Sequence, residues 1–336
     1  MSTTALPQAA AELHPWLDAG LALAPEYVDA KTAHTGPGPA YASHWPMALH
    51  ALSALGASAA ELAAFDGHER QALPPRAAWP ALDRDEAELR QRIAAEGAPS
   101  VLADCLPERM AHAGAAAFHG LIRTAHAWES GHAGELALAL AWWRQRDQPL
   151  APASASPPPE LDWADWQSAL GALRRPTPWP RAWIATRMQA WADDPGFQRW
   201  APTLRLRGST LKDLATAALT AYAASGDFTL LHAVTACRAM AVLGPCLDPA
   251  QVTPALRAFS QHWAAAALAS GWHGGRDTWP EPPAPWAWPR LLALARTHPD
   301  AHAIKLTHAA WDWVHRGLND GLCRQAATRA LATRAA

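Results

Sequence analysis

The segment from His302 to His308 places two histidines and a lysine at helical spacing. This lysine, Lys305, is one of only three in the chain, because arginine takes most of the other cationic positions. Residues three apart on a helix share a face, so His302 and Lys305 can converge on one point. A buried lysine loses its proton easily, and its neutral amine can react with carbon dioxide to give a carbamate, an anionic oxygen ligand. The segment therefore predicts half of a metal site, or alternatively a solvated lysine beside surface histidines.

Three further histidines lie in strongly apolar surroundings, His44 within SHWPMAL, His119 within AFHGLI and His232 within LLHAVT. An imidazole buried without a partner is costly, and a single buried histidine is most often hydrogen-bonded within a core. Four such histidines on separate helices, His302 included, together with Lys305, favour a shared centre in which facing helices supply metal ligands.

Spacing alone leaves other candidates open. His112 and His126 lie seven residues on either side of His119 and can share its helical face, while His308 and His315 compete with His302 on the same helix. Histidines in polar or proline-adjacent contexts are expected at the surface. These are His14, His68, His262 and His298.

Length and composition predict a globular protein with a large core. The chain has 336 residues, 50% of them hydrophobic, and a formal charge of −2 at pH 7. Its basic residues are scattered, so neither nucleic acid nor a membrane is an expected partner. Four separated cysteines without a CxxC pair are typical of a reduced compartment. Since no signal-like segment opens the chain and no stretch approaches about 20 apolar residues, we expect a cytoplasmic protein.

Alanine and leucine recur at helical spacing, and runs of β-branched residues are nearly absent, which predicts an all-α fold. We expect a single large helical-bundle-like domain with long proline- and tryptophan-rich loops. Helices are expected from Pro46 to Leu55, from near Pro107 to about Trp128, from Gly134 to Trp143, and over residues 181–193, 210–224, 229–243, 251–269 and 299–317.

Tryptophan is the dominant aromatic residue of the chain. The stretch from Trp272 to Asp277, followed by Trp279, Trp286 and Trp288 among prolines, predicts a rigid aromatic loop. Such a loop either covers a flat ring substrate by stacking or closes the end of a helical core.

Four ordered segments, SHWPMALHALSALGA, AAFHGLIRTAHA, GDFTLLHAVTA and HAIKLTHA, resemble signature segments of the questin oxidase-like family. The resemblance extends from about residue 30 to about residue 315. It implies one helical domain over residues 31–320, with a proline-rich loop insertion at 151–160, an N-terminal lead-in over 1–30 and a C-terminal helix or tail over 321–336. Fungal members of this family oxidatively open anthraquinone rings, so the resemblance implies an oxygenase that acts with dioxygen on a polycyclic phenol or quinone.

The resemblance further implies a mononuclear non-haem iron centre. Its ligands would be His44, His119, His232, His302 and a carbamylated Lys305. Imidazole nitrogen and a carboxylate-like oxygen suit Fe(II), and these ligands fill five positions of an octahedron, which leaves one for dioxygen.

Two departures from the family pattern bear on substrate and catalysis. Ser43 stands where asparagine is usual, and His126 stands where an aromatic residue is usual. His126 is therefore the candidate catalytic residue, as a proton donor in the pocket or as a rival ligand. The family also implies NADPH as a co-substrate, but no G-x-G-x-x-G motif follows a strand. We expect NADPH to reduce the substrate or to act through a reductase partner.

Two other classes of protein remain consistent with these residues. A metal-dependent hydrolase could use the same histidines and carbamylated lysine around zinc or a two-metal centre. A non-enzymatic helical scaffold could keep the histidines as core residues and bind a partner through its tryptophan-rich surface.

Overall fold

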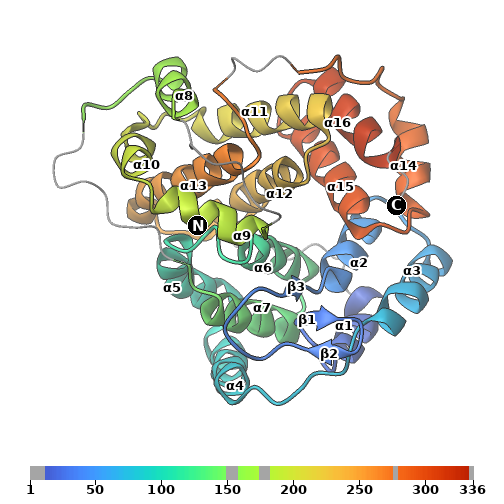
Figure 1. Cartoon of the computed structure of the whole chain (residues 1–336). Helices are drawn as coiled ribbons and strands as arrows, with labels where there is room; N and C mark the ends of the chain where they lie inside the picture. The colour runs from blue at the N-terminus through green and yellow to red at the C-terminus, as the bar shows by residue number, and fades with distance from the viewer. Residues whose placement is uncertain (1–11, 149–157, 174–181, 275–278, 333–336) are drawn as a thin grey trace.

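The computed structural model describes residues 12–148, 158–173, 182–274 and 279–332, and these are mainly helical (Figure 1). Its helices are α1 (His14–Gly20), α2 (Trp45–Ala54), α3 (Ala59–Ala72), α4 (Pro80–Glu96), α5 (Ala98–Met110), α6 (His119–Ser130), α7 (Ala133–Gln145), α8 (Trp163–Gly171), α9 (Ile184–Ala192), α10 (Pro195–Trp200), α11 (Thr210–Ser225), α12 (Phe228–Leu243), α13 (Pro249–Ala269), α14 (Trp288–Arg296), α15 (Ala301–His315) and α16 (Asp320–Ala332). The predicted all-α class is confirmed.

A small antiparallel sheet is the main departure from helix. Strand β1 (Glu26–Asp29) pairs with β2 (Thr32–Ala33) on one side and with β3 (Tyr41–Ala42) on the other. The carboxylate of Glu26, which is buried, accepts a hydrogen bond of 2.8 Å from the indole of Trp142 on α7 and pairs with Arg146, the residue that follows α7. The sheet is thereby attached to the C-terminal end of α7, beside the cavity described below.

One predicted helix is interrupted. The sequence predicts a helix from near Pro107 to about Trp128, but α5 ends at Met110 and α6 begins only at His119. Three consecutive residues before α6 have positive φ: 48° at Ala116, 56° at Ala117 and 69° at Phe118. Because alanine favours a right-handed helix, this turn is strained, and strain of this kind persists only where surrounding contacts fix the chain.

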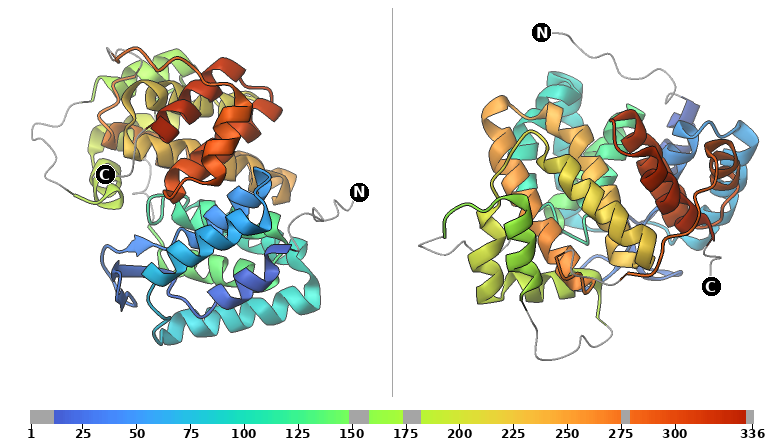
Figure 2. Two further views of the ribbon diagram at one scale, coloured as in Figure 1. Left: turned by 90° about the vertical axis from the view of Figure 1, so that its right-hand side faces the viewer. Right: turned by 90° about the horizontal axis from the view of Figure 1, so that it is seen from above.

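The helices form two layers, and the buried hydrophobic residues form one large core and a second, small cluster around Trp79 and Trp142. Helices of the first half, in blue to green, lie in one layer, and those of the second half, in yellow to red, lie in the other (Figure 2). The core also contains Leu13 and Leu17 from the predicted lead-in and Cys323 and Leu331 from the predicted tail, so it extends beyond residues 31–320. Residues 151–157 of the predicted insertion lie outside the described residues.

Four helices at the meeting of the two layers form a closed ring. In this ring, α2 packs on α6, α6 on α12, α12 on α15, and α15 on α2. Pro46 stands in the first turn of α2, and Asp227 and Asp300 cap the N-termini of α12 and α15 through their side chains. These caps fix where each helix begins, within a few residues of the histidines of interest.

The segment Phe228–Cys246, which includes α12, is long and apolar enough to span a membrane by length and composition, contrary to the sequence expectation. In its most apolar window 72% of the residues are buried within the protein. A buried core helix passes the same test, and α12 has this character because neighbouring helices surround it on several sides.

Candidate metal centre

The four helices of the ring each contribute one histidine to a single cluster. His44 precedes the first residue of α2, His119 opens α6, His232 lies in the first turns of α12, and His302 is the second residue of α15. The structure therefore brings together all four histidines that the sequence nominates. We call this cluster, with Lys305, the first histidine centre.

The four imidazoles make a closed ring in the same order as their helices. Ring centroids are 4.7 Å apart for His44 and His119, 4.9 Å for His119 and His232, 5.5 Å for His232 and His302, and 4.2 Å for His302 and His44. Metal–nitrogen bonds of about 2.1 Å place each centroid about 3.2 Å from the ion, so two imidazoles at a right angle have centroids about 4.5 Å apart. The observed spacings lie around this value.

The outward-facing nitrogens of three of these imidazoles have fixed acceptors. Nδ1 of His119 donates to the carbonyl oxygen of Ala116 at 2.5 Å, in the strained turn, and Nδ1 of His232 donates to that of Phe228 at 2.8 Å. Nδ1 of His302 donates to the Asp300 carboxylate at 3.0 Å. Each Nε2 is then left with its lone pair, the arrangement that metal-binding histidines show.

The inward-facing nitrogens lie close together, and one of them has no hydrogen-bond partner among the described residues. Nε2 of His44 lies 2.7 Å from Nε2 of His119, and candidate ligand nitrogens of His44, His119 and His232 all lie within 4.8 Å of one another. Nε2 of His302 is buried and has no hydrogen-bond partner among the residues that the structure describes. An orphaned buried nitrogen is costly, and a metal ion would satisfy it.

Burial keeps these imidazoles neutral, which is the form that binds metals. Desolvation lowers the pKa of His119 to about 3 and holds the pKa values of His44 and His232 well below their usual range. The pKa of His302 is lowered by the same cause, although its hydrogen bond to Asp300 opposes the shift. The positive charge of Lys305 contributes to the lowering at all four histidines.

Lys305 is buried, with 2% of its surface exposed, one turn along α15 from His302. Desolvation lowers the pKa of its amine to about 7, and the negative charge of Asp300 limits the shift. Near neutral pH a large share of this amine is therefore unprotonated and nucleophilic. The alternative of a solvated lysine is wrong.

The first histidine centre opens on a cavity of about 1340 Å³. All four histidines line it, together with Asp300 at the start of α15. Its other walls come from the loop 37–42, the C-terminal end of α7 and the N-terminal end of α9, and they include the aromatic residues Tyr27, Tyr41, Trp142, Trp183 and Phe228. Such a volume accommodates a ligand of several fused rings.

Aromatic rings line this cavity both beside the histidines and farther from them. Phe228 contacts the rings of His232 and His302 at centroid distances of 4.8 and 4.6 Å. Tyr41 and Trp183, both exposed, contact each other edge to face at 4.7 Å. The predicted loop that includes Trp279, Trp286 and Trp288 instead packs on the core and does not line the cavity, and residues 275–278 lie outside the described residues.

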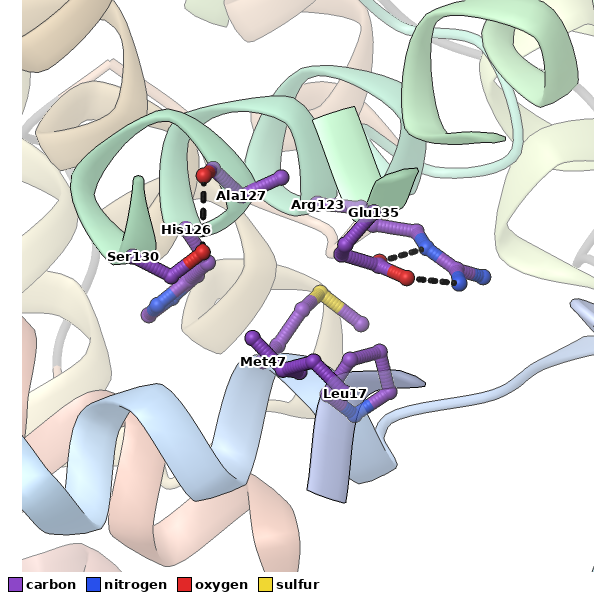
Figure 3. A pocket seen from close by; sticks show the side chains of 8 residues that line it. Leu17, Met47, Arg123, His126, Ala127, Ser130 and Glu135 are labelled. Carbon is purple, nitrogen blue, oxygen red and sulfur yellow. Dashed lines mark hydrogen bonds and ion pairs between the residues drawn. The ribbon is translucent and has the colours of Figure 1, made fainter. Parts of the chain in front are cut away.

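His126 is not part of the first histidine centre and does not line the large cavity. It lies deeper along α6, next to a narrow pocket beside Met47 and Ser130, with the ion pair of Arg123 and Glu135 nearby (Figure 3). Nδ1 of His126 is 2.9 Å from Nδ1 of His50, a residue that the sequence analysis did not nominate. This position does not support a role for His126 as proton donor in the cavity.

Two other sequence expectations about histidines have different outcomes. His262 was expected at the surface, but only 2% of it is exposed, and its Nε2 donates to the carbonyl oxygen of Ala111 at 3.0 Å. This expectation is wrong because His262 lies on the inward face of α13. His68 is exposed, as expected.

Comparison with known proteins gives no family for this chain. A scan against known protein families finds no match, and a search of curated proteins finds none.

Proposed function

We propose that this protein is a non-haem iron oxygenase that oxidises, and in doing so can open, a ring of a flat polyphenol or quinone, as the questin oxidase-like family does. The observation that carries the proposal is the convergence of four imidazoles at one side of a large aromatic-lined cavity, with the buried Lys305 one turn along α15 from His302. His44, His119, His232 and His302 would hold the iron, with Lys305 as its carbamate.

The residues fit such an ion in charge as well as in geometry. The imidazoles are neutral, and carbamylation of the unprotonated Lys305 amine supplies an anion: the nitrogen attacks carbon dioxide, a C–N bond forms as one C–O π bond opens to a carboxylate, and one proton leaves the nitrogen for solvent. Nitrogen and hard oxygen ligands together favour Fe(II) over soft metals. When bound, the iron would supply redox chemistry toward dioxygen and the aromatic substrate.

Other residues of the chain bind and orient the substrate. Phe228 lines the cavity and contacts His232 and His302 edge to face, so its ring offers an aromatic surface beside the centre on which a planar substrate can pack. Arg187 lines the cavity while its guanidinium donates to the carbonyl oxygen of Ala269 at 2.8 Å and to the hydroxyl of Thr229 at 2.9 Å. Its positive charge favours the phenolate form of a bound polyphenol.

A dedicated NADPH fold is not visible among the described residues. Their three-stranded sheet is antiparallel, whereas a Rossmann unit requires parallel strands joined by helices. We therefore propose that NADPH, where it is required, reduces the substrate or acts through a reductase partner.

The test is oxygen uptake by metal-free protein reloaded anaerobically with Fe(II) or with Zn(II). A panel of hydroxylated anthraquinones and their quinols, each with and without NADPH, serves as substrate. We expect oxygen consumption and a ring-oxidised product with the iron-loaded parent and not with the zinc-loaded parent, and neither with Lys305→Met taken through the same iron loading. Hydrolytic turnover with zinc would instead establish the hydrolase alternative, and failure to retain either metal would overturn both.

A further inference from the structure

A second histidine cluster lies in the same ring of helices. His50 on α2, His126 on α6 and His308 on α15 follow the first-centre histidines of their helices by six, seven and six residues. With a helical rise of about 1.5 Å per residue, the two clusters are about 9–10 Å apart along the helices. We call these three residues the second histidine centre.

The three imidazoles form a nearly equilateral triangle. Their ring centroids are 5.1 Å apart for His50 and His126, 5.7 Å for His50 and His308, and 5.6 Å for His126 and His308. Three imidazoles around one ion, with metal–nitrogen bonds of about 2.1 Å, have centroids about 5.2 Å apart in a tetrahedron and about 5.5 Å apart in a plane. One ligand nitrogen from each residue lies within 4.8 Å of the other two.

The polar atoms of the second histidine centre are not fully satisfied by one another. All three residues are more than nine-tenths buried. The only contact between ring nitrogens that the structure records among them is the 2.9 Å pair of His50 and His126, and Nδ1 of His308 has no partner among the described residues. Three buried imidazoles with an orphaned nitrogen are expensive in an apolar core unless an ion binds them.

The charge around the second histidine centre does not exclude a cation. The fourth helix, α12, places Arg238 six residues after His232, at the position that corresponds to the three histidines. Its guanidinium lies 2.7 and 2.8 Å from the two carboxylate oxygens of Glu129 and 3.0 Å from one of Asp312. Two carboxylates therefore compensate this cation. Asp312 also pairs with Arg316 at 3.0 Å, so the two cations and two carboxylates nearly cancel beside the imidazoles.

We propose that His50, His126 and His308 bind a second metal ion, a divalent cation of the zinc type, separate from the first histidine centre. None of the three lines the large cavity, so this ion does not meet the substrate. Three neutral imidazoles satisfy zinc and leave one tetrahedral position for a water molecule. The ion ties α2, α6 and α15 together, and these helices carry His44, His119, His302 and Lys305. The second site thereby sets the distances between ligands of the first. The proposal rests on side-chain geometry alone and does not depend on the reaction.

The test counts the Co²⁺ equivalents that metal-free protein takes up, followed by visible absorption and by elemental analysis after gel filtration. The parent is compared with His308→Asn, with His232→Asn, with the double variant, and with His262→Asn, a buried histidine outside both clusters. Circular dichroism establishes that each variant is folded. We expect two equivalents for the parent and His262→Asn, one for each single cluster variant, and none for the double variant.

The proposal is overturned if His308→Asn binds as many equivalents as the parent. This includes the case in which the parent takes up a single equivalent and His308→Asn keeps it. If His308→Asn does not fold, the number of equivalents that the parent binds decides. A parent that binds one equivalent, which His232→Asn loses, has no second site. A parent whose equivalents are unchanged in His232→Asn but reduced in His308→Asn supports the second site and rejects the first, so the two claims fail separately.

Discussion

The Nε2 atoms of His44 and His119 lie 2.7 Å apart, although 75 positions separate the two residues in the sequence. Two ligands at a right angle on one ion, with bonds of about 2.1 Å, have nitrogens about 3.0 Å apart. The helix contacts of α2 and α6 therefore hold two imidazoles within a few tenths of an ångström of the separation that one ion requires. The same separation also fits an N–H···N hydrogen bond between the two rings, so metal binding by this pair is a proposal that the predictions below test.

Lys305 should carry a carbamate in the metal-loaded protein. Its pKa of about 7 leaves a reactive amine near neutral pH, and the four surrounding imidazoles provide no anion to balance a dication. Incubation with ¹³C-labelled carbon dioxide should give one protected carbamate signal by NMR. The signal should be absent from Lys305→Met and present in Lys31→Met, which changes an exposed lysine. An equal signal in both variants would show that the carbamate forms elsewhere.

Asp300 should strengthen metal binding through His302. Its carboxylate accepts from Nδ1 of His302 at 3.0 Å and also caps α15. Loss of such an outer partner typically lowers metal affinity about 10–100-fold. Asp300→Asn keeps a capping oxygen, so we expect this loss of iron affinity with little change in Tm. Asp227→Asn is the matched control, because Asp227 caps α12 without contacting a ligand imidazole. Equal affinities in the two variants would contradict the role of Asp300.

Gly120 should be required for the close approach of α6 to α7. A Cβ atom at this position would lie 2.5 Å from the Trp143 ring, which is fully buried and donates to the carbonyl oxygen of His112 at 3.0 Å. Overpacking of this kind costs about 1–3 kcal/mol, so Gly120→Ala should lower the free energy of unfolding and weaken metal binding at the adjacent His119. Gly67→Ala meets nothing within 4 Å in α3 and should stabilise the protein by about 0.5–1 kcal/mol. Denaturant titration of both variants measures the difference, and a neutral Gly120→Ala would refute the packing argument.

His262 should make the protein less stable in mild acid. Burial lowers its pKa from 6.5 to about 4. Between these values the unfolded chain binds more protons, so stability falls as the pH falls from about 6.5 toward 4. At pH 5 the loss relative to pH 8 is about 2 kcal/mol for this group. The amide of His262→Gln can still donate to Ala111 but does not titrate. Between pH 8 and pH 5 the free energy of unfolding of this variant should therefore fall by about 2 kcal/mol less than that of the parent. Identical pH profiles would show that His262 does not titrate in this way.

The sequence predicts the centre better than its surroundings. Buried helices are predicted by Pro46 and by the apolar residues around His44, His119, His232 and His302. The structure places these four histidines together. The turn before α6 is not predictable in the same way, because Ala116 and Ala117 favour helix and only tertiary contacts impose their positive φ.

The second histidine centre and the cavity depend on long-range packing. His126 was nominated without its partners, since spacing within one helix does not reveal which residue of another helix faces it. The spacing from His44 to His50, repeated from His302 to His308, was a signal that could have indicated a second cluster. No local pattern predicts that the loop 37–42 and the start of α9 meet above the first histidine centre.

The iron centre itself is tested by the iron content of protein purified without chelators or affinity metals. The comparison needs the parent, Lys305→Met, His232→Ala and the control His262→Gln, each verified as folded. We predict about one iron per chain at the first histidine centre in the parent and the control, and at least a tenfold reduction in the other two variants. Iron that Lys305→Met and His232→Ala retain at the parent level, or a parent that holds no iron even after anaerobic loading with Fe(II), would rule out this iron centre.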